Sequence, residues 1–414
     1  MTHAAFQNHA NPELFFSVGE PSGDLHGANL IQALRRRIPD LSVRGFGGEK
    51  MANSNCYLDY ELTKLAVVGF AEVVPKLREF FRVADIASDI FDAERPDAVV
   101  LIDFPGFNWH IARRAKERGI PVCYYLPPQM WAWGGWRISK VKKYVDHVLC
   151  NLPFEKAWYA ERGVAAEYVG HPFFDEVSNR ELDQQFLLDH GTTGECTVAV
   201  LPGSRGSEVK NIWPMQLEVL RELAARYPKV RFHVGCLRDE HLELCQSMLK
   251  SRDRNIQLEM HVGKTSELIE LADCTLMKSG SVSLEMMARG TPSVVLYHVS
   301  RLTYAIGRIL TDLESMTLPN MIAKETIMPE FLAVGNRKSD TIERTIGAMD
   351  RLIGDRDERK RQKQALLELN LQFGRTGASE RAASALISKL GIDQNAAATS
   401  FDSESLATGS RRAA

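Results

Sequence analysis

Two short loops carry the residue types that could bind an anionic ligand. The first is Ser17–Asp24 (SVGEPSGD) and the second is Leu201–Arg205 (LPGSR). Each follows an apolar, β-rich run and leads into a helix-like pattern. A strand, a glycine-rich turn and a helix start leave backbone N–H groups free at the strand end, where they can bind phosphate. Because the arrangement occurs once in each half of the chain, it predicts two nucleotide-fold domains that face a central cleft.

The first loop combines Gly19 and Gly23 with the acids Glu20 and Asp24. Glycine permits tight turns and a close approach of the backbone to a ligand. The loop also contains Ser22, and either Ser22 or Asp24 would serve as the N-cap of the following helix. Capping alone does not require two glycines, a proline and two acids, so the composition favours a ligand loop.

Asp103 directly follows the apolar run Ala98–Ile102 and begins the sequence Asp103–Asn108 (DFPGFN). Ligands of open α/β sheets bind beyond the carboxyl ends of the strands. A carboxylate at that place, beside aromatic rings that lower the local dielectric constant, can become a general base. The same residues also suit a simple turn, because Asp and Asn beside Pro-Gly are common turn formers. The position at the strand end favours the catalytic interpretation.

Three tryptophans lie within the segment Pro127–Trp136 (PPQMWAWGGW), and four basic residues follow between 137 and 143. Tryptophan beside basic residues suits an interface where apolar chains meet phosphates or lipid headgroups. A cluster in the core is the alternative. The flanking Pro-Pro and Gly-Gly pairs place the segment on a loop, and the two interpretations stay equally open.

The second half contains two comparable strand-to-helix turns. Gly203–Glu208 (GSRGSE) is typical of a diphosphate cradle, since its backbone N–H groups are joined by Arg205, whose planar guanidinium suits phosphate oxygens. Lys278–Glu285 (KSGSVSLE) places Glu285 in the first turns of a helix, where the carboxylate could accept hydrogen bonds from ribose hydroxyls. Alternatively, Glu285 only complements the helix dipole. Together the two turns predict a nucleotide site.

Apolar runs of strand length alternate with helix-like segments in both halves of the chain, which predicts doubly wound, parallel α/β sheets. Charged and Gly/Thr-rich sequence at 175–195 indicates a domain boundary, with one domain at 11–185 and the next at 186–365. From 339 to 390 the pattern is helical. We expect a flexible polar arm at 1–10. An Ala/Ser/Thr-rich tail at 391–414 lacks apolar periodicity, so we expect it to be disordered.

The composition excludes several classes of protein. A formal net charge of −2 argues against a nucleic-acid partner, which usually requires a basic excess. The 7 cysteines are scattered and never spaced C-x-x-C, which indicates free thiols in a reducing compartment. No signal peptide and no apolar run of about 20 residues is present, so we expect a cytoplasmic protein that can still touch a membrane. The H-E-x-x-H, Walker A and G-x-G-x-x-G motifs are absent, so we expect no metal ligands and no cofactor.

Taken in order, these motifs resemble the lipid-A-disaccharide synthase family, whose members join two acylated glucosamines. The resemblance extends from about Leu14 to Glu330 and depends on the order and spacing of its motifs. The matching stretches are Ser17–Asp24, Gly45–Gly48 with Met51, Asp103–Asn108, Trp131–Trp133, Tyr168–Pro172, Leu201–Arg205 with Glu208, Ser279–Glu285 and Leu318–Asn320.

The resemblance implies a metal-independent, inverting glycosyltransferase of the GT-B type, which transfers 2,3-diacylglucosamine from its UDP conjugate onto 2,3-diacylglucosamine 1-phosphate. It implies peripheral association with the inner face of the membrane, a helix at 366–390 that crosses back to the N-terminal domain, and a homodimer. Asp103 matches the base. The donor-side residues are then Gly203, Ser204, Arg205, Ser279, Gly280, Glu285 and Asn320; the acceptor-side residues are Gly19, Glu20, Ser22, Gly23, Asp24, Asn108, Trp131 and Trp133.

The sequence departs from the family pattern on the acceptor side. Pro127-Pro128-Gln129 precedes the tryptophan pair where a serine is expected, and Gly134-Gly135-Trp136 follows it. Two other functions share many of these features. Another GT-B enzyme acting on a UDP-hexosamine, such as a lipid-linked glucosaminyltransferase or a UDP-N-acetylglucosamine 2-epimerase, would share the second half, although an epimerase needs no lipid site. A non-catalytic module that binds a UDP-sugar or lipid would bind nucleotide without releasing UDP.

Overall fold

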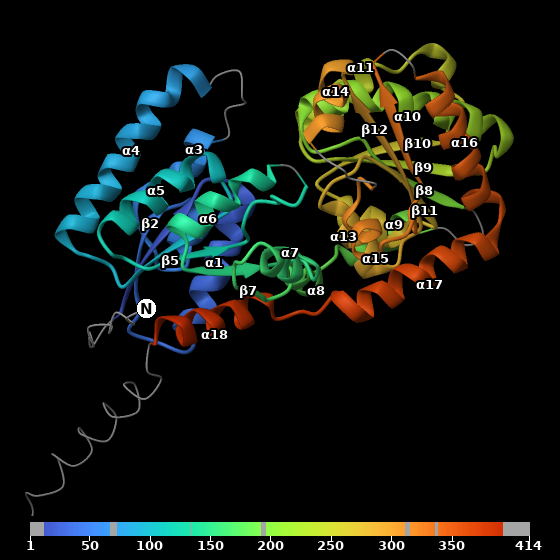
Figure 1. Ribbon diagram of the computed structural model, residues 1–414. Coiled ribbons are helices and arrows are strands. Elements are labelled where there is room, and N and C mark those ends of the chain that lie inside the picture. The colour runs from blue at the N-terminus through green and yellow to red at the C-terminus, as the bar shows by residue number, and fades with distance from the viewer. Residues whose placement is uncertain are drawn as a thin grey trace, which may run out of the picture. The chain divides into compact units, whose positions relative to one another are not determined.

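The structure is a computed structural model of the chain, and it describes residues 12–66, 73–132, 134–191, 196–310, 315–335 and 338–391 (Figure 1). The expected arm at 1–10, Trp133 and nearly all of the expected tail at 391–414 lie outside these residues. The chain divides into two compact units. Unit 1 contains the residues up to Pro172 and those from Gly377 onward, and unit 2 is Phe173–Thr376. The division therefore comes earlier than the expected boundary at 185.

Unit 1 is built on a seven-stranded sheet in the order β3-β2-β1-β4-β5-β6-β7, in which every pair is parallel. Its strands are β1 (Glu13–Val18), β2 (Ser42–Phe46), β3 (Tyr57–Tyr60), β4 (Ala98–Ile102), β5 (Val122–Tyr125), β6 (His147–Cys150) and β7 (Ala166–Tyr168). Its helices are α1 (Pro21–Arg35), α2 (Glu49–Asn53), α3 (Leu62–Ala66), α4 (Val73–Ala93), α5 (Pro105–Glu117), η2 (Gly135–Arg137), α6 (Ile138–Tyr144), α7 (Glu155–Glu161) and α18 (Ala378–Leu390).

Unit 2 is built on a six-stranded sheet in the order β10-β9-β8-β11-β12-β13, again with every pair parallel. Its strands are β8 (Thr197–Leu201), β9 (Arg231–Cys236), β10 (Leu258–Val262), β11 (Cys274–Met277), β12 (Ser293–Val299) and β13 (Glu330–Val334). Its helices are α8 (Phe173–Asn179), α9 (Gln184–His190), α10 (Gly206–Arg226), α11 (Asp239–Ser247), η3 (Ser251–Asp253), α12 (Thr265–Leu271), α13 (Val282–Arg289), α14 (Arg301–Leu310), α15 (Leu318–Ala323), α16 (Ser339–Gly354) and α17 (Arg356–Phe373).

These two sheets confirm the predicted pair of doubly wound parallel domains. The strands are continuous apolar runs because both faces of the sheet are buried. In unit 1, Phe16 and Val100 pack with α1 and α18 on one face, whereas Phe15 and Leu101 pack with α4 and α5 on the other. Such two-sided burial requires a strand that is apolar at every position, as β4 is.

The C-terminal helices differ from the single crossing helix expected at 366–390. Residues 366–373 of the expected helix belong to α17, whose Leu366 and Leu369 are buried with α13 in unit 2. The chain then begins α18, which lies along α1 in unit 1 (Figure 1). Leu386 and Leu390 enter the core of unit 1, and Glu380 forms ion pairs with Arg36 and Arg37.

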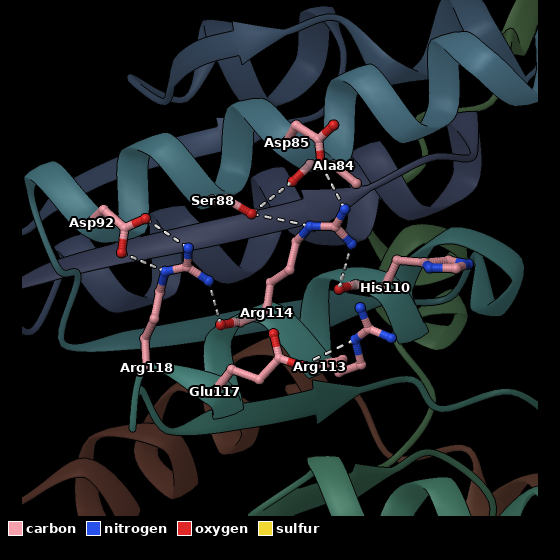
Figure 2. A network of polar contacts seen from close by, with 9 residues as sticks. All are labelled: Ala84, Asp85, Ser88, Asp92, His110, Arg113, Arg114, Glu117 and Arg118. Carbon is pink, nitrogen blue, oxygen red and sulfur yellow. Dashed lines mark hydrogen bonds and ion pairs between the residues drawn. The ribbon is translucent and has the colours of Figure 1, made fainter.

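Helix α4 is fastened to α5 by a row of polar contacts (Figure 2). Arg114 Nη2 donates to Asp85 at 2.7 Å, and its Nε donates to Ser88 at 3.0 Å. Just beyond α5, the Arg118 guanidinium contacts both carboxylate oxygens of Asp92, at 2.7 and 2.6 Å. Paired hydrogen bonds of this kind fix orientation as well as distance, so they orient α5, the helix that begins directly after Asp103 and Phe104.

Candidate active site

The two strands at the centre of unit 1, β1 and β4, lie where the strand order reverses. Ser17 is in register with Leu101, and Val18 with Ile102. The loop that starts at Gly19 and the residue Asp103 therefore leave the sheet at neighbouring points of its carboxyl edge. Ligands of doubly wound sheets bind at this switch point, so the fold brings the two predicted motifs of unit 1 together at the expected place.

Asp103 and Phe104 occupy the left-handed region of backbone conformation, with φ of 45° and 44°. Residues other than glycine adopt this conformation rarely, and it is concentrated at functional sites. The turn places the Phe104 ring directly over Gly19, where a Cβ atom would lie 2.2 Å from Phe104 Cδ1. Tyr124 supports the turn, because its hydroxyl donates to the Asp103 carbonyl at 2.7 Å. The position of the Phe104 ring thus requires a glycine at position 19.

The electrostatic environment of Asp103 suits a proton acceptor. Burial and, to a smaller extent, the neighbouring Glu20 carboxylate raise the pKa of Asp103 to about 6, against opposing effects of the Phe104 amide and His26. A carboxylate with a pKa near 6 is deprotonated at neutral pH yet more basic than a solvated one. His171, which follows β7, lies near His26, and burial lowers the pKa of His171 to about 3.

Asn108 acts on this turn through the backbone. Its Nδ2 donates to the carbonyls of Ser17, Ile102 and Asp103 at 3.2, 3.2 and 2.8 Å, and its Oδ1 accepts the Ser17 hydroxyl at 2.7 Å. The side chain is fully buried. It was predicted on the acceptor side of the site, and its contacts make it the clamp that holds the ends of β1 and β4 together.

The two acidic residues of the first loop, Glu20 and Asp24, make different contacts. Asp24 is buried, and its carboxylate accepts from the amides of Gly48, Lys50 and Met51 at 2.7, 3.0 and 3.3 Å. It therefore caps α2. Glu20, in contrast, precedes α1 without a capping contact, and Ser22 is exposed in the first turn of that helix. Asp24 therefore has a structural role, whereas Glu20 lies at the start of α1 without a capping contact.

The tryptophan segment is part core and part surface. Trp131 is partly buried, and its Nε1 donates to Glu155 at 2.9 Å. Glu155 is fully buried and also accepts from the amides of Asn151 and Leu152, and burial raises its pKa to about 7. Trp136 is 67% exposed. The segment therefore belongs neither wholly to the core nor wholly to the surface.

In unit 2 the loops after β8 and β11 also leave the sheet at its switch point. They are joined by Glu208, whose carboxylate accepts from the Ser204 amide at 3.1 Å, from Arg205 at 3.3 Å and from Lys278 at 2.9 Å. Burial works to raise the pKa of Glu208, but Lys278, the Ser204 amide and Arg205 together outweigh it, so the pKa lies below its usual value. Gly203, with φ of 133°, makes room for this carboxylate. The Arg205 side chain is 75% exposed at the start of α10.

The remaining donor-side residues hold loops. The Ser279 hydroxyl donates to the Met316 carbonyl at 2.6 Å, and Gly280 is exposed before α13. Glu285 is buried and paired with Arg289 within α13 at 3.0 Å. Asn320 is buried, donates to Met328 and Glu330, and accepts from the Ile327 and Met328 amides. These contacts fix the segment around α15 next to Ser279.

The family model for lipid-A-disaccharide synthetase matches residues 14–386. The chain belongs to this family. A lipid-A-disaccharide synthase of Myxococcus xanthus (strain DK1622) is 32% identical over 92% of this chain and 98% of its own length. That of Syntrophus aciditrophicus (strain SB) is 35% identical over 88% of this chain and 94% of its own length. Members of the lipid-A-disaccharide synthase family are glycosyltransferases, so the chain is an enzyme of that class.

Solved structures show the same fold at low identity. A UDP-GlcNAc 2-epimerase from Neisseria meningitidis bound to UDP-GlcNAc has a TM-score of 0.58, with 15% identity over 91% of this chain and 99% of its own. The glycotransferase of kitacinnamycin has a TM-score of 0.58, with 16% identity over 92% of this chain and 99% of its own. Within the described part of the chain, no helix combines the length and the apolar character needed to span a bilayer.

Sequence reasoning missed two residues that shape these sites in the lipid-A-disaccharide synthase fold. Lys278 belonged to a recognised motif, but its partner Glu208 is 70 positions away, so the pair could not be inferred. Gln216 of α10 is fully buried, and its Nε2 donates to the Leu201 and Leu276 carbonyls at 3.2 and 3.3 Å. It clamps β8 to β11 as Asn108 clamps β1 to β4. A polar residue on an apolar helix face is the one signal that could have indicated it.

Proposed function

We propose that the chain transfers 2,3-diacylglucosamine from UDP-2,3-diacylglucosamine to 2,3-diacylglucosamine 1-phosphate, which forms a β-1,6-linked disaccharide 1-phosphate and UDP. The observation that carries the proposal is Asp103, a carboxylate with a raised pKa at the switch point of unit 1 in a chain of this family. The names of the relatives supply the class of product, and the residue supplies the base that the reaction needs.

In the proposed step, Asp103 takes the proton from the acceptor 6-hydroxyl as the oxygen attacks the anomeric carbon. The new C–O bond forms while the bond from that carbon to the UDP phosphate breaks, and the anomeric centre inverts. Negative charge then grows on the leaving diphosphate. Arg205 and Lys278, together with the amides at the start of α10, supply positive charge for it without a metal ion.

We also propose that the surface around Trp136 meets the inner face of the membrane, because both substrates carry acyl chains. Trp136 is exposed, and the Arg137 guanidinium lies 5.1 Å from the centre of its ring. In unit 1, Arg113, Lys116, Glu117, Lys143 and Tyr144 line a shallow depression of about 360 Å³, and its three basic side chains would be attracted to an anionic membrane surface. The homodimer implied by the resemblance is part of the same proposal, and analytical ultracentrifugation tests it.

One assay tests the reaction. Supplying both monosaccharide lipids should release UDP and form a disaccharide lipid, detected by mass spectrometry, and Asp103→Asn should abolish most of both signals. UDP binding without release would favour a binding module. Conversion of UDP-N-acetylglucosamine to its 2-epimer would favour the epimerase function.

A further inference from the structure

Three histidines and one glutamate meet at the edge of the sheet in unit 2, away from its switch point. His190 is the last residue of α9, while Glu259 and His261 lie two positions apart on the edge strand β10. His233 lies on β9, in register with Glu259. The candidate ligand atoms of His190, Glu259 and His261 all lie within 4.8 Å of one another.

The distances between these atoms match those of a small metal site. His190 Nε2 is 3.6 Å from Glu259 Oε2, which is 3.8 Å from His261 Nε2. His261 Nε2 is in turn 3.1 Å from His233 Nδ1. With metal–ligand bonds of about 2.0–2.1 Å, tetrahedral ligand atoms lie about 3.3 Å apart. The two distances from Glu259 to the histidines, 3.6 and 3.8 Å, are a few tenths of an ångström longer than that value.

His190 directs its second ring nitrogen at Glu259. Its Nδ1 lies 3.0 Å from the Phe186 carbonyl, which can only accept, so this nitrogen donates to the backbone. The other nitrogen, Nε2, lies 3.6 Å from Glu259 Oε2. A ring N–H bonded to a backbone carbonyl is also the usual outer contact of a histidine that binds a metal.

The surroundings hold the remaining ligands in place. Arg231 Nη2 contacts the other oxygen of Glu259 at 3.0 Å, which orients the carboxylate. The Phe186 ring stacks on His190 at 4.1 Å and meets His261 edge-on at 5.0 Å. His233 is buried, whereas the Glu259 side chain is 42% exposed, which leaves a path for an ion from solvent.

From this geometry we propose that His190, Glu259 and His261 bind one divalent ion of the zinc type, which joins α9 to the edge of the sheet. Imidazole and carboxylate ligands suit Zn²⁺ and its analogue Co²⁺. The ion has a structural task here: it covers the edge strand with a helix of seven residues that lacks a buried face. The three ligands lie on two separate elements, α9 and β10, which is why no sequence motif indicated them.

The test uses the full-length, tag-free protein after chelator treatment, titrated with Zn²⁺ in a calorimeter and with Co²⁺ in an absorption spectrometer. We expect one equivalent of each metal, with the intense visible bands of tetrahedral Co²⁺. His261→Ala and His190→Gln should weaken binding by more than the about 10- to 100-fold that loss of an outer contact costs, and Arg231→Ala should fall within that range. His147→Ala, a partly buried histidine of unit 1, is the matched control.

Thermal unfolding with and without Zn²⁺ gives a second readout. Each variant is compared with itself, so the shift reports metal binding and not a change in folding. Zn²⁺ should raise the melting temperature of the parent protein and of His147→Ala, and leave that of His190→Gln unchanged. Absence of stoichiometric binding by the parent protein, octahedral Co²⁺ spectra, or unchanged affinity in both His190→Gln and His261→Ala would overturn the proposal. Because metal alone is the ligand, the outcome is independent of the proposed glycosyl transfer.

Discussion

Glu208 accepts a hydrogen bond from Lys278 Nζ at 2.9 Å, and both side chains are 14% exposed. The pair connects the turn after β8 to the turn after β11, and the same carboxylate also holds the Ser204 amide and Arg205. One carboxylate thus gathers three hydrogen-bond donors, two of them cationic, at the switch point of unit 2. In the proposed function, the leaving diphosphate would offer these donors the same kind of partner.

Asp103→Asn should lower kcat by about 10²–10⁴-fold, because a positioned general base contributes about that much. UDP affinity, measured by calorimetry, should stay within twofold, since the side chain lies in unit 1 and the residues proposed to bind the nucleotide lie in unit 2. Asp89→Asn, an exposed acid on α4, is the control. Near-normal turnover of a folded Asp103→Asn variant would remove Asp103 from the mechanism.

The pH profile of the parent enzyme should follow the same carboxylate. Since burial raises the pKa of Asp103 to about 6 and the base must be deprotonated, kcat/KM should fall tenfold per pH unit below about 6 and level off above it. The raised pKa also means that the charged form is penalised in the folded state, so Asp103→Asn should raise the melting temperature more at pH 8 than at pH 4. A profile that is flat from pH 5 to 8 would contradict the assignment.

Arg205→Ala should weaken UDP binding by about 10- to 100-fold, the value of a charge-assisted hydrogen bond. Its exposed side chain contacts only Glu208 among the described residues, so the change should leave the melting temperature unaltered. Arg205→Lys should restore binding only in part, because an ammonium cannot contact two phosphate oxygens as a planar guanidinium does. Lys210→Ala, exposed on the same helix, should bind UDP normally.

Asn320→Ala should act on stability before it acts on chemistry. The change removes four hydrogen bonds at a buried position and leaves the Ile327 and Met328 amides without that partner, which should cost about 1–3 kcal/mol. UDP affinity should fall less than in Arg205→Ala, measured below the melting transition. Loss of UDP binding with an unchanged melting temperature would show instead that Asn320 contacts the nucleotide directly.

Trp136→Ala together with Arg137→Ala should reduce co-sedimentation with anionic vesicles at low salt. Trp136 offers apolar surface, and each cation near an anionic membrane adds about 1 kcal/mol. Leu371→Ala, which removes an exposed apolar side chain from unit 2, should bind vesicles as the parent does. Binding that responds neither to salt nor to the double substitution would show that this surface is not the membrane contact.

The sequence predicted local features well and long-range pairs poorly. Apolar runs such as Ala98–Ile102 show their burial residue by residue, so the strands, the two domains and the loops at the strand ends could be inferred. The type of a polar residue does not by itself show which group it will bond to. Asn108, Asp24 and Asn320 were expected to face ligands, whereas their side-chain atoms hold the backbone of the loops.

The division of the C-terminal helices could not be predicted for a related reason. Both α17 and α18 carry buried leucines, and nothing in their spacing says which sheet each one covers. The ion pairs of Glu380 with Arg36 and Arg37 join residues more than 340 positions apart. Contacts of that range depend on the completed fold, which sequence periodicity does not record.

The packing of α18 on α1 sets the order in which the two units can fold during synthesis. The ribosome makes unit 2 after most of unit 1 but before α18, the helix that shares a buried core with Leu30 and Leu34. Unit 2 has a continuous sequence and can close its own core as it emerges, whereas unit 1 must wait with an uncovered apolar face until α18 leaves the exit tunnel. The nascent enzyme therefore exposes, for most of its translation, a surface that a chaperone or a second nascent chain could occupy.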